Sequence, residues 1–161
     1  MMRPIFWAIC LMSSGVINAA VSQRIFNEPV IITESHQAVF YENNDGEYVH
    51  KWNESGLARN EGFATLIKYK ASSFQVRVTE HIEMAGPSNW DLQHYQECEI
   101  KGNGIEITCT SLKSNDGIFY SNWLLVEDDP TGPIKVTVTI EDGSPQVFNF
   151  KLEDRLNLFA K

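Results

Sequence analysis

The segment Glu97–Thr110, ECEIKGNGIEITCT, is nearly symmetric about its central Asn103-Gly104 pair. An Asn-Gly pair between alternating apolar residues is the strongest short-range signal for a β-hairpin, because both residues tolerate positive φ. Folding the segment about this pair brings together Gly102 and Ile105, Lys101 and Glu106, Ile100 and Ile107, Glu99 and Thr108, and Cys98 and Cys109. The sequence therefore predicts a hairpin in which the two cysteines face each other.

We expect Cys98 and Cys109 to form a disulfide across this hairpin. A two-residue loop would put them at a hydrogen-bonded pair. A four-residue loop keeps the same pairing and moves them to a non-hydrogen-bonded pair, which suits a disulfide better. The alternative is a redox-active pair, but the Cys-x-x-Cys spacing that lowers a thiol pKa is missing. A structural disulfide formed in an oxidising compartment is the prediction.

Strand signals continue on both sides of the hairpin, separated by turn residues. Glu80 interrupts one apolar face, so a bulge or strand end is expected there. Residues 118–126 are apolar on both faces, which is typical of a central strand or of a strand with one face reserved for a partner. Short helices are expected only within 53–61 or 154–160. The predicted strands are 37–41, 64–70, 74–84, 92–101, 105–112, 118–126, 134–140 and 147–152.

This succession of short strands predicts an all-β fold. An antiparallel β-sandwich of about seven or eight strands, immunoglobulin-like in outline, fits it best, and a small β-barrel is the alternative. The sequence shows no internal repeat or linker, so one domain is expected.

The first residues resemble a secretory signal. Arg3 precedes the apolar run IFWAICLM, and small residues at Ala19 and Ala20 offer a cleavage site. The run is shorter than the roughly 20 residues of a membrane-spanning helix. We therefore expect residues 1–20 to be a cleaved signal peptide and residues 21–161 to be a single β-sandwich domain, periplasmic or secreted, with no integral membrane segment after cleavage.

The chain is acidic, with a formal net charge of −8 over 161 residues. Nucleic acids and anionic membranes attract Lys and Arg, so this balance argues against nucleic acid as a partner. It is compatible with another protein as the partner, including a basic one. The sequence does not specify an oligomeric state.

No catalytic or metal-binding motif stands out. The four histidines lack ligand spacing, and neither a nucleophile elbow nor a phosphate-binding glycine loop is present. We therefore expect no catalytic residue, no metal site and no cofactor. His81 and His94 lie near Glu80 and Asp91 in the sequence, which leaves an enzyme with a dispersed site as an alternative.

Aromatic and acidic residues are the better candidates for contacts with a partner. Trp and Tyr are favoured as anchors at interfaces. Trp90, in the polar segment GPSNWD, is the best candidate for an exposed anchor, and the acidic loop after residue 126 is the best candidate for a charged contact. The alternatives are core packing for the aromatic residues and a solvated turn for the acidic loop. The candidate partner-binding residues are Trp90, Tyr95, Tyr120, Trp123, Glu127, Asp128 and Asp129.

Three functions are compatible with these observations. The leading hypothesis is an exported, non-enzymatic protein-binding module such as an inhibitor, an immunity protein or a small chaperone. The second is a structural subunit of a surface fibre or adhesin, although residues 24–33 alternate poorly and contain Pro29, unlike a donor strand. The third is the enzyme with a dispersed site.

The closing segment 134–152, IKVTVTIEDGSPQVFNFKL, resembles the last hairpin of small immunoglobulin-like periplasmic proteins, including chaperones of curli-type fibres. The Cys-x-Cys of the curli chaperone is absent from this sequence, and no functional residue is carried over.

Overall fold

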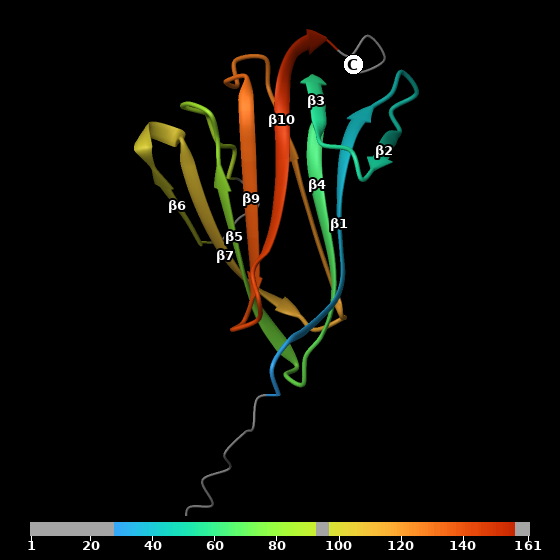
Figure 1. The fold of residues 1–161 in the computed structure, drawn as a ribbon, viewed down its shortest axis with the longest axis vertical. Coiled ribbons are helices and arrows are strands. Elements are labelled where there is room, and N and C mark those ends of the chain that lie inside the picture. The colour runs from blue at the N-terminus through green and yellow to red at the C-terminus, as the bar shows by residue number, and fades with distance from the viewer. Residues whose placement is uncertain (1–27, 93–96, 157–161) are drawn as a thin grey trace, which may run out of the picture.

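Two β-sheets make up the structure, a computed structural model that describes residues 28–92 and 97–156 (Figure 1). One sheet has four strands in the order β2-β1-β4-β8, and the other has six in the order β3-β10-β9-β5-β7-β6. The strands are β1 (Ile31–Glu42), β2 (Tyr48–Trp52), β3 (Gly56–Arg59), β4 (Gly62–Lys70), β5 (Gln75–Glu83), β6 (Glu97–Lys101), β7 (Glu106–Ser114), β8 (Ile118–Leu124), β9 (Gly132–Ile140) and β10 (Gln146–Leu156).

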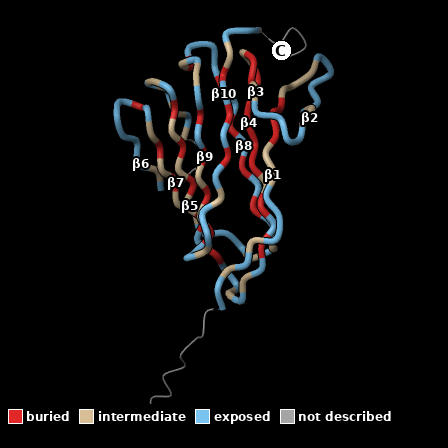
Figure 2. The backbone as a smooth tube through the Cα atoms, in the orientation of Figure 1, coloured by how far each residue is buried: buried red, intermediate tan, exposed pale blue. Residues whose placement is uncertain are grey.

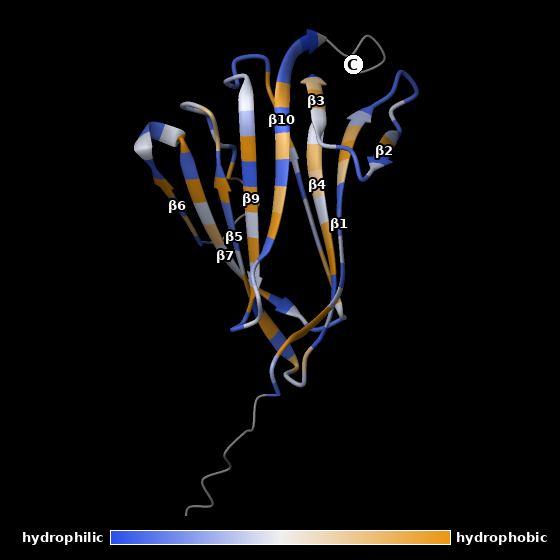
Figure 3. Cartoon of the chain, in the orientation of Figure 1, coloured by the Kyte–Doolittle hydropathy of each residue, from blue (hydrophilic) through white to orange (hydrophobic). Residues whose placement is uncertain are grey.

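The predicted β-sandwich is confirmed, and the two sheets share no strand in the described part of the chain, unlike a small barrel. Apolar residues of both sheets form one buried core, and along β9 buried apolar residues alternate with more exposed ones (Figures 2 and 3). Phe63 of one sheet packs against Phe150 of the other, with ring centroids 5.1 Å apart. Burial of these facing rows is what holds the sheets together.

Two strands were not predicted, and the helix expected within 53–61 is wrong. β2 ends at Trp52 just before that stretch, which turns at Asn53 and then forms β3, and Asn60 follows β3. Both asparagines have left-handed φ, 63° and 67°. Because β3 is only four residues long and pairs in parallel with β10, it carries no hairpin signal. At the other end of the chain, 154–156 continue β10 rather than starting a helix. Of the predicted strand 92–101, residues 97–101 form β6, and residues 93–96 lie outside the described part of the chain.

The bulge expected at Glu80 is also wrong. β5 pairs with β7 and β9 without a register shift, and Glu80 lies opposite Cys109 and Val138. Its side chain takes an inward position between Val78 and Ile82 and is only 4% exposed. The carboxyl group interrupts the apolar pattern of the sequence, but β5 continues through it as a regular strand.

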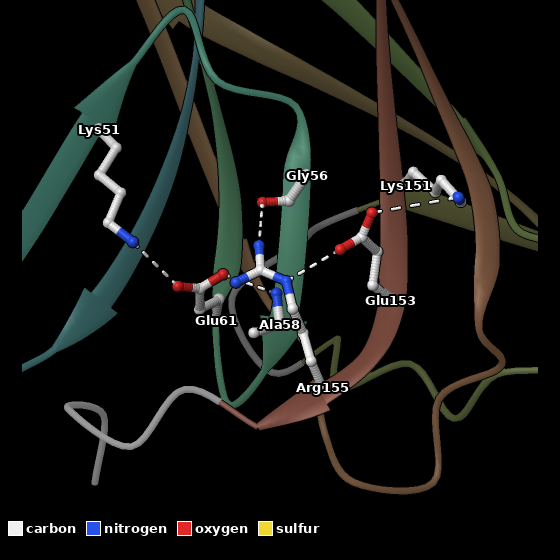
Figure 4. Close-up of polar contacts among 7 residues, drawn as sticks. All are labelled: Lys51, Gly56, Ala58, Glu61, Lys151, Glu153 and Arg155. Atoms are coloured by element: carbon white, nitrogen blue, oxygen red, sulfur yellow. Dashed lines mark hydrogen bonds and ion pairs between the residues drawn. The ribbon is translucent and has the colours of Figure 1, made fainter.

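The chain changes sheets between β3 and β4, and a buried carboxylate holds the bend. Glu61 accepts a hydrogen bond from the Ala58 N–H at 2.6 Å and forms an ion pair with Lys51 at 3.3 Å (Figure 4). Arg155 of β10 donates to the Gly56 carbonyl at 3.3 Å. These contacts tie β3 to the edge of the six-stranded sheet, from where β4 enters the other sheet.

The disulfide hairpin forms as predicted. β6 and β7 pair in the expected register, and Cys98 is bonded to Cys109. Their Cα atoms are 4.1 Å apart, near the roughly 4.5 Å of a non-hydrogen-bonded pair. The loop between the strands is the four-residue form, residues 102–105 between β6 and β7, and a hydrogen bond from the Ile105 N–H to the Gly102 carbonyl lies within it. Asn103 takes the left-handed conformation, with φ 56°.

Residues 1–20 lie outside the described part of the chain, so the signal peptide and the division at residue 20 stay predictions. Within 28–92 and 97–156, no helix is long and apolar enough to cross a membrane.

Candidate functional site

β8 forms one edge of the four-stranded sheet, and its outer backbone groups have no neighbouring strand within the described residues. The Leu125 N–H donates to the Glu61 carbonyl at 3.2 Å, and the Tyr69 N–H donates to the Gly117 carbonyl at 2.9 Å. Antiparallel partners exchange hydrogen bonds at every second residue, so odd-numbered residues of β8 bond to β4. The residues that direct their backbone N–H and C=O groups to the free edge are therefore Ile118, Tyr120, Asn122 and Leu124, and of these the Ile118 N–H already donates to the Asp116 carboxylate at 3.0 Å.

The side chains of β8 are apolar on both faces. Its inward residues join the core, whereas on the outer face Tyr120 is 43% exposed and Leu124 is 60% exposed. The sequence left two interpretations of this segment, a covered central strand or a strand with one face reserved for a partner. The sheet order rules out the first, because β8 is an edge strand, and the second stays a prediction.

A groove of about 590 Å³ runs along this edge. On its inner side, the groove lies between β8 and the facing strands β5 and β7. On its outer side, it lies along the solvent-facing surface of β8 and the neighbouring strands. Its residues include Trp90, Trp123 and Leu125 on the inner side, and Phe40, Tyr48 and Tyr120 on the outer side. Such a volume is in the range of sites that bind ligands or side chains of a partner.

The outer wall is aromatic because small residues leave room for large ones. Phe40 lies over Gly62, where an added Cβ would come within 2.4 Å of the ring. His50 stacks on Phe40 with centroids 5.6 Å apart, and its Nε2 lies 3.0 Å from the Tyr120 hydroxyl. The aromatic surface is thus held by contacts across the whole sheet, from β2 to β8.

Glu80 forms the polar floor of the groove. Its Oε2 accepts hydrogen bonds from the Ser121 hydroxyl at 2.9 Å and from the Trp123 indole N–H at 3.1 Å. Its Oε1 is buried and has no hydrogen-bond partner among the described residues. The hydroxyl oxygen of Thr65 is also buried without a hydrogen-bond partner among the described residues. Thr65 is in β4 and lies opposite Ser121 of β8. The groove therefore ends on an incompletely satisfied polar group inside an apolar core.

The environment of Glu80 opposes its charge. Burial raises the pKa of this carboxyl above its ordinary value of 4.5, and the hydrogen bonds from Ser121 and Trp123 and the charge of Lys113 act in the opposite direction. Burial is the largest of these effects, since the carboxylate loses its hydration and no described cation forms an ion pair with it.

Glu80→Gln should stabilise the fold at alkaline pH. The folded state binds the Glu80 proton more tightly than the unfolded chain does, so stability due to Glu80 is greatest below the ordinary pKa and is lost as pH rises through the raised pKa. We expect the variant to gain about 1–2 kcal/mol in free energy of unfolding at pH 8 and little at pH 4. Urea denaturation at both values measures it. A variant less stable than the parent at pH 8 would contradict this account of the site.

The matched control is Glu83→Gln, on the same strand but on the outer face. Lys135 bonds Glu83 at 2.9 Å and lowers the pKa of that carboxyl. The stability contributed by the Glu83–Lys135 pair is present above the ordinary pKa of Glu83 and is lost as pH falls. The control variant should therefore show no gain in free energy of unfolding at pH 8.

The loop 85–91 covers one end of the groove and is fixed at both sides. The Trp90 indole N–H donates to the Gly104 carbonyl at 2.9 Å, and its ring meets Trp123 edge-on with centroids 5.5 Å apart. Ser88 donates its hydroxyl hydrogen to the Asp129 carboxylate. The loop thus links the disulfide hairpin to the acidic loop that follows β8.

The predicted partner-binding residues divide into groups. Trp90, Tyr120 and Trp123 all line the groove, so the structure brings these three together. Trp123 is buried, Tyr120 is exposed, and Trp90 is half-buried rather than the exposed anchor expected from its polar segment. Tyr95 lies outside the described residues.

The acidic loop separates into exposed and buried members. Glu127 and Asp128 are exposed. Asp129 is buried, accepts the Val126 N–H at 2.8 Å and so fixes the loop itself. Arg59 donates to the backbone carbonyls of Glu127 and Asp129, each at 2.7 Å.

Sequence reasoning missed Glu80 and Ser121 as site residues. The signal for Glu80 was present, because a charged residue interrupted a regular apolar face, but it was interpreted as a break in the strand. His81 points to the opposite face and bonds Thr108 at 2.9 Å, so it does not join Glu80. No group of three His, Cys, Asp or Glu side chains suited to a metal ion occurs among the residues described.

The fold and the groove define a two-sheet β-sandwich with one open edge strand. A family model described as the PM0630 beta sandwich domain matches residues 37–153, so the chain belongs to this family of β-sandwich domains. The match includes every groove residue named above. No curated protein sequence matches the chain.

Proposed function

We propose that this chain is an exported, non-enzymatic protein-binding module that takes up an extended segment of a partner protein along the free edge of β8. The observation that carries the proposal is the combination of a free strand edge with apolar side chains on both of its faces and a groove beside it. Strands of this kind are usually protected in monomeric proteins, because they pair with other chains.

Strand addition would use the free edge, the apolar side chains on both faces of β8 and the groove. The backbone of an incoming strand would hydrogen-bond to Tyr120, Asn122 and their even-numbered neighbours. Its side chains would alternate between the inner and outer walls of the groove, because successive residues of a strand point to opposite faces. The preferred segment is extended and apolar, and the net charge of −8 favours a basic partner.

Export is the second part of the proposal. Its support is the signal-like segment 1–20 together with the Cys98–Cys109 disulfide, a bond that persists in oxidising compartments. Sequencing the amino terminus of the protein made in its native host tests it directly. We expect the mature chain to begin at Ala20 or Val21, and a chain that keeps Met1 would contradict export.

Asn122→Pro tests strand addition with little effect on the fold. The Asn122 N–H faces the free edge, so proline removes a donor that pairs with no strand among the described residues. Peptides selected by the parent protein from a random decapeptide library on phage provide the probe. We expect them to alternate apolar residues, and we expect Asn122→Pro to weaken their binding at least tenfold while changing the free energy of unfolding by less than about 1 kcal/mol.

Ile100→Pro is the matched control, because β6 is the edge strand of the other sheet and Ile100 faces Ile107 in a non-hydrogen-bonded pair, so its N–H points to the free edge. It should leave binding unchanged. Equal binding by the parent and Asn122→Pro would contradict strand addition at β8. Light scattering of the parent protein distinguishes a fibre subunit from a module that binds another protein. Self-multimers that are lost in Asn122→Pro would mean that a second copy of this chain occupies the β8 edge.

A further inference from the structure

Glu80 is an unusual residue for the interior of a β-sandwich. It lies at the centre of the six-stranded sheet, between Val78 and Ile82, and no cation of the described residues forms an ion pair with it. Only one of its carboxyl oxygens is hydrogen-bonded by described residues, and Glu80 is among the residues that line the groove. Buried carboxyl groups that lack partners are costly and uncommon, so the position is better explained by a group that arrives from outside.

We propose that Glu80 anchors a basic side chain, Lys or Arg, of the segment bound at β8, with Oε1 as the atom that receives it. This inference rests on the proposed function and deepens it, since it names the side chain that the partner must supply.

The geometry of strand addition leads a side chain to this carboxyl group. Ser121 and Trp123 point inward from β8, and both donate to Oε2 of Glu80. An inward residue of a strand added beside them would enter the same gap between the sheets. Lys and Arg have apolar stems that can lie along the groove while the charged end reaches its floor.

The groove walls would also favour a cation. The rings of Trp90 and Trp123, which line the groove, meet edge-on within it, and aromatic rings attract cations. A cation at Oε1 would stabilise the carboxylate, which burial otherwise disfavours.

None of the other charged side chains described near Glu80 forms an ion pair or hydrogen bond with its Oε1. Lys113 of β7 lies on the same face as Glu80 but is exposed, and it aligns with Val76, two inward positions away along β5. Asp91 and Asp129 line the groove and add negative charge, while Asp129 is engaged by Ser88 and the Val126 N–H. The field at the groove is therefore suited to a positive group.

Matched synthetic peptides test the inference. From the phage-selected decapeptides we take one with a Lys or Arg at an inward position and compare it with a copy carrying norleucine there, using fluorescence anisotropy. We expect the replacement to weaken binding to the parent protein at least tenfold and to change binding to Glu80→Gln less than twofold. Glu83→Gln, altered on the outer face of β5, should behave as the parent.

The outcomes separate this inference from the proposed function. Apolar peptides that depend on the β8 edge but show no basic position, or an equal loss with Glu80→Gln, would overturn the anchor and leave strand addition intact. Selection of no peptide at all would overturn both. The norleucine comparison on the parent protein keeps the test decisive if Glu80→Gln does not fold.

Discussion

Gly104→Ala should lower the free energy of unfolding by about 3 kcal/mol and release the loop 85–91. Gly104 has φ 93°, a region that costs an L-residue roughly 1–2 kcal/mol. An added Cβ would also come within 2.2 Å of the Ser88 carbonyl oxygen, which is backbone and cannot rotate away. The Gly104 carbonyl is the acceptor for Trp90, so displacement of the loop would also remove that contact.

Gly46→Ala separates conformational strain from the steric clash. Gly46 has a similar φ of 81°, but its added Cβ would meet nothing closer than 3.8 Å. Urea denaturation should show a loss of about 1 kcal/mol for this control. Equal losses in the two variants would mean that the loop does not pack on the hairpin as described. Tryptophan fluorescence should change for Gly104→Ala alone, since Trp90 is the residue released.

Removal of the disulfide is expected to cost about 3 kcal/mol. The bond closes a loop of 11 residues, for which the chain-entropy relation gives a stabilisation of this size. β6 pairs only with β7, so this edge strand depends on the bond more than an inner strand would. Denaturation of the parent protein with and without reductant measures the loss.

The control for this experiment is Cys98→Ser combined with Cys109→Ala. It should unfold at the same denaturant concentration with and without reductant, close to the reduced parent. A difference of less than about 1 kcal/mol between the oxidised and reduced parent would contradict the expected contribution.

The hairpin and the sandwich could be predicted because their signals are local. Asn103-Gly104 fixes the register of β6 and β7, and that register in turn brings Cys98 and Cys109 together. Alternating apolar residues likewise specify β9 and β10. By contrast, β3 is four residues long and pairs in parallel with a strand about a hundred residues away in sequence, so no neighbouring residue encodes it.

The groove could be predicted only in part. Trp90, Tyr120 and Trp123 were chosen by residue type and proved to be neighbours, although nothing in the sequence places loop 85–91 against β8. Glu80 was misinterpreted because a charged residue in an alternating strand usually marks an irregularity. Whether such a residue bends the strand or points inward depends on partners such as Ser121, 41 residues away, which only the fold brings near.

The central claim is that the free edge of β8 accepts a strand of another protein. The most direct measurement is residue-resolved amide hydrogen exchange by NMR, with and without a selected peptide. The account predicts slower exchange at Tyr120, Asn122 and Leu124, whose N–H groups face the edge, and no change at Ile100 on the opposite sheet. Binding that leaves these β8 amides unprotected, or that protects another edge instead, would contradict it.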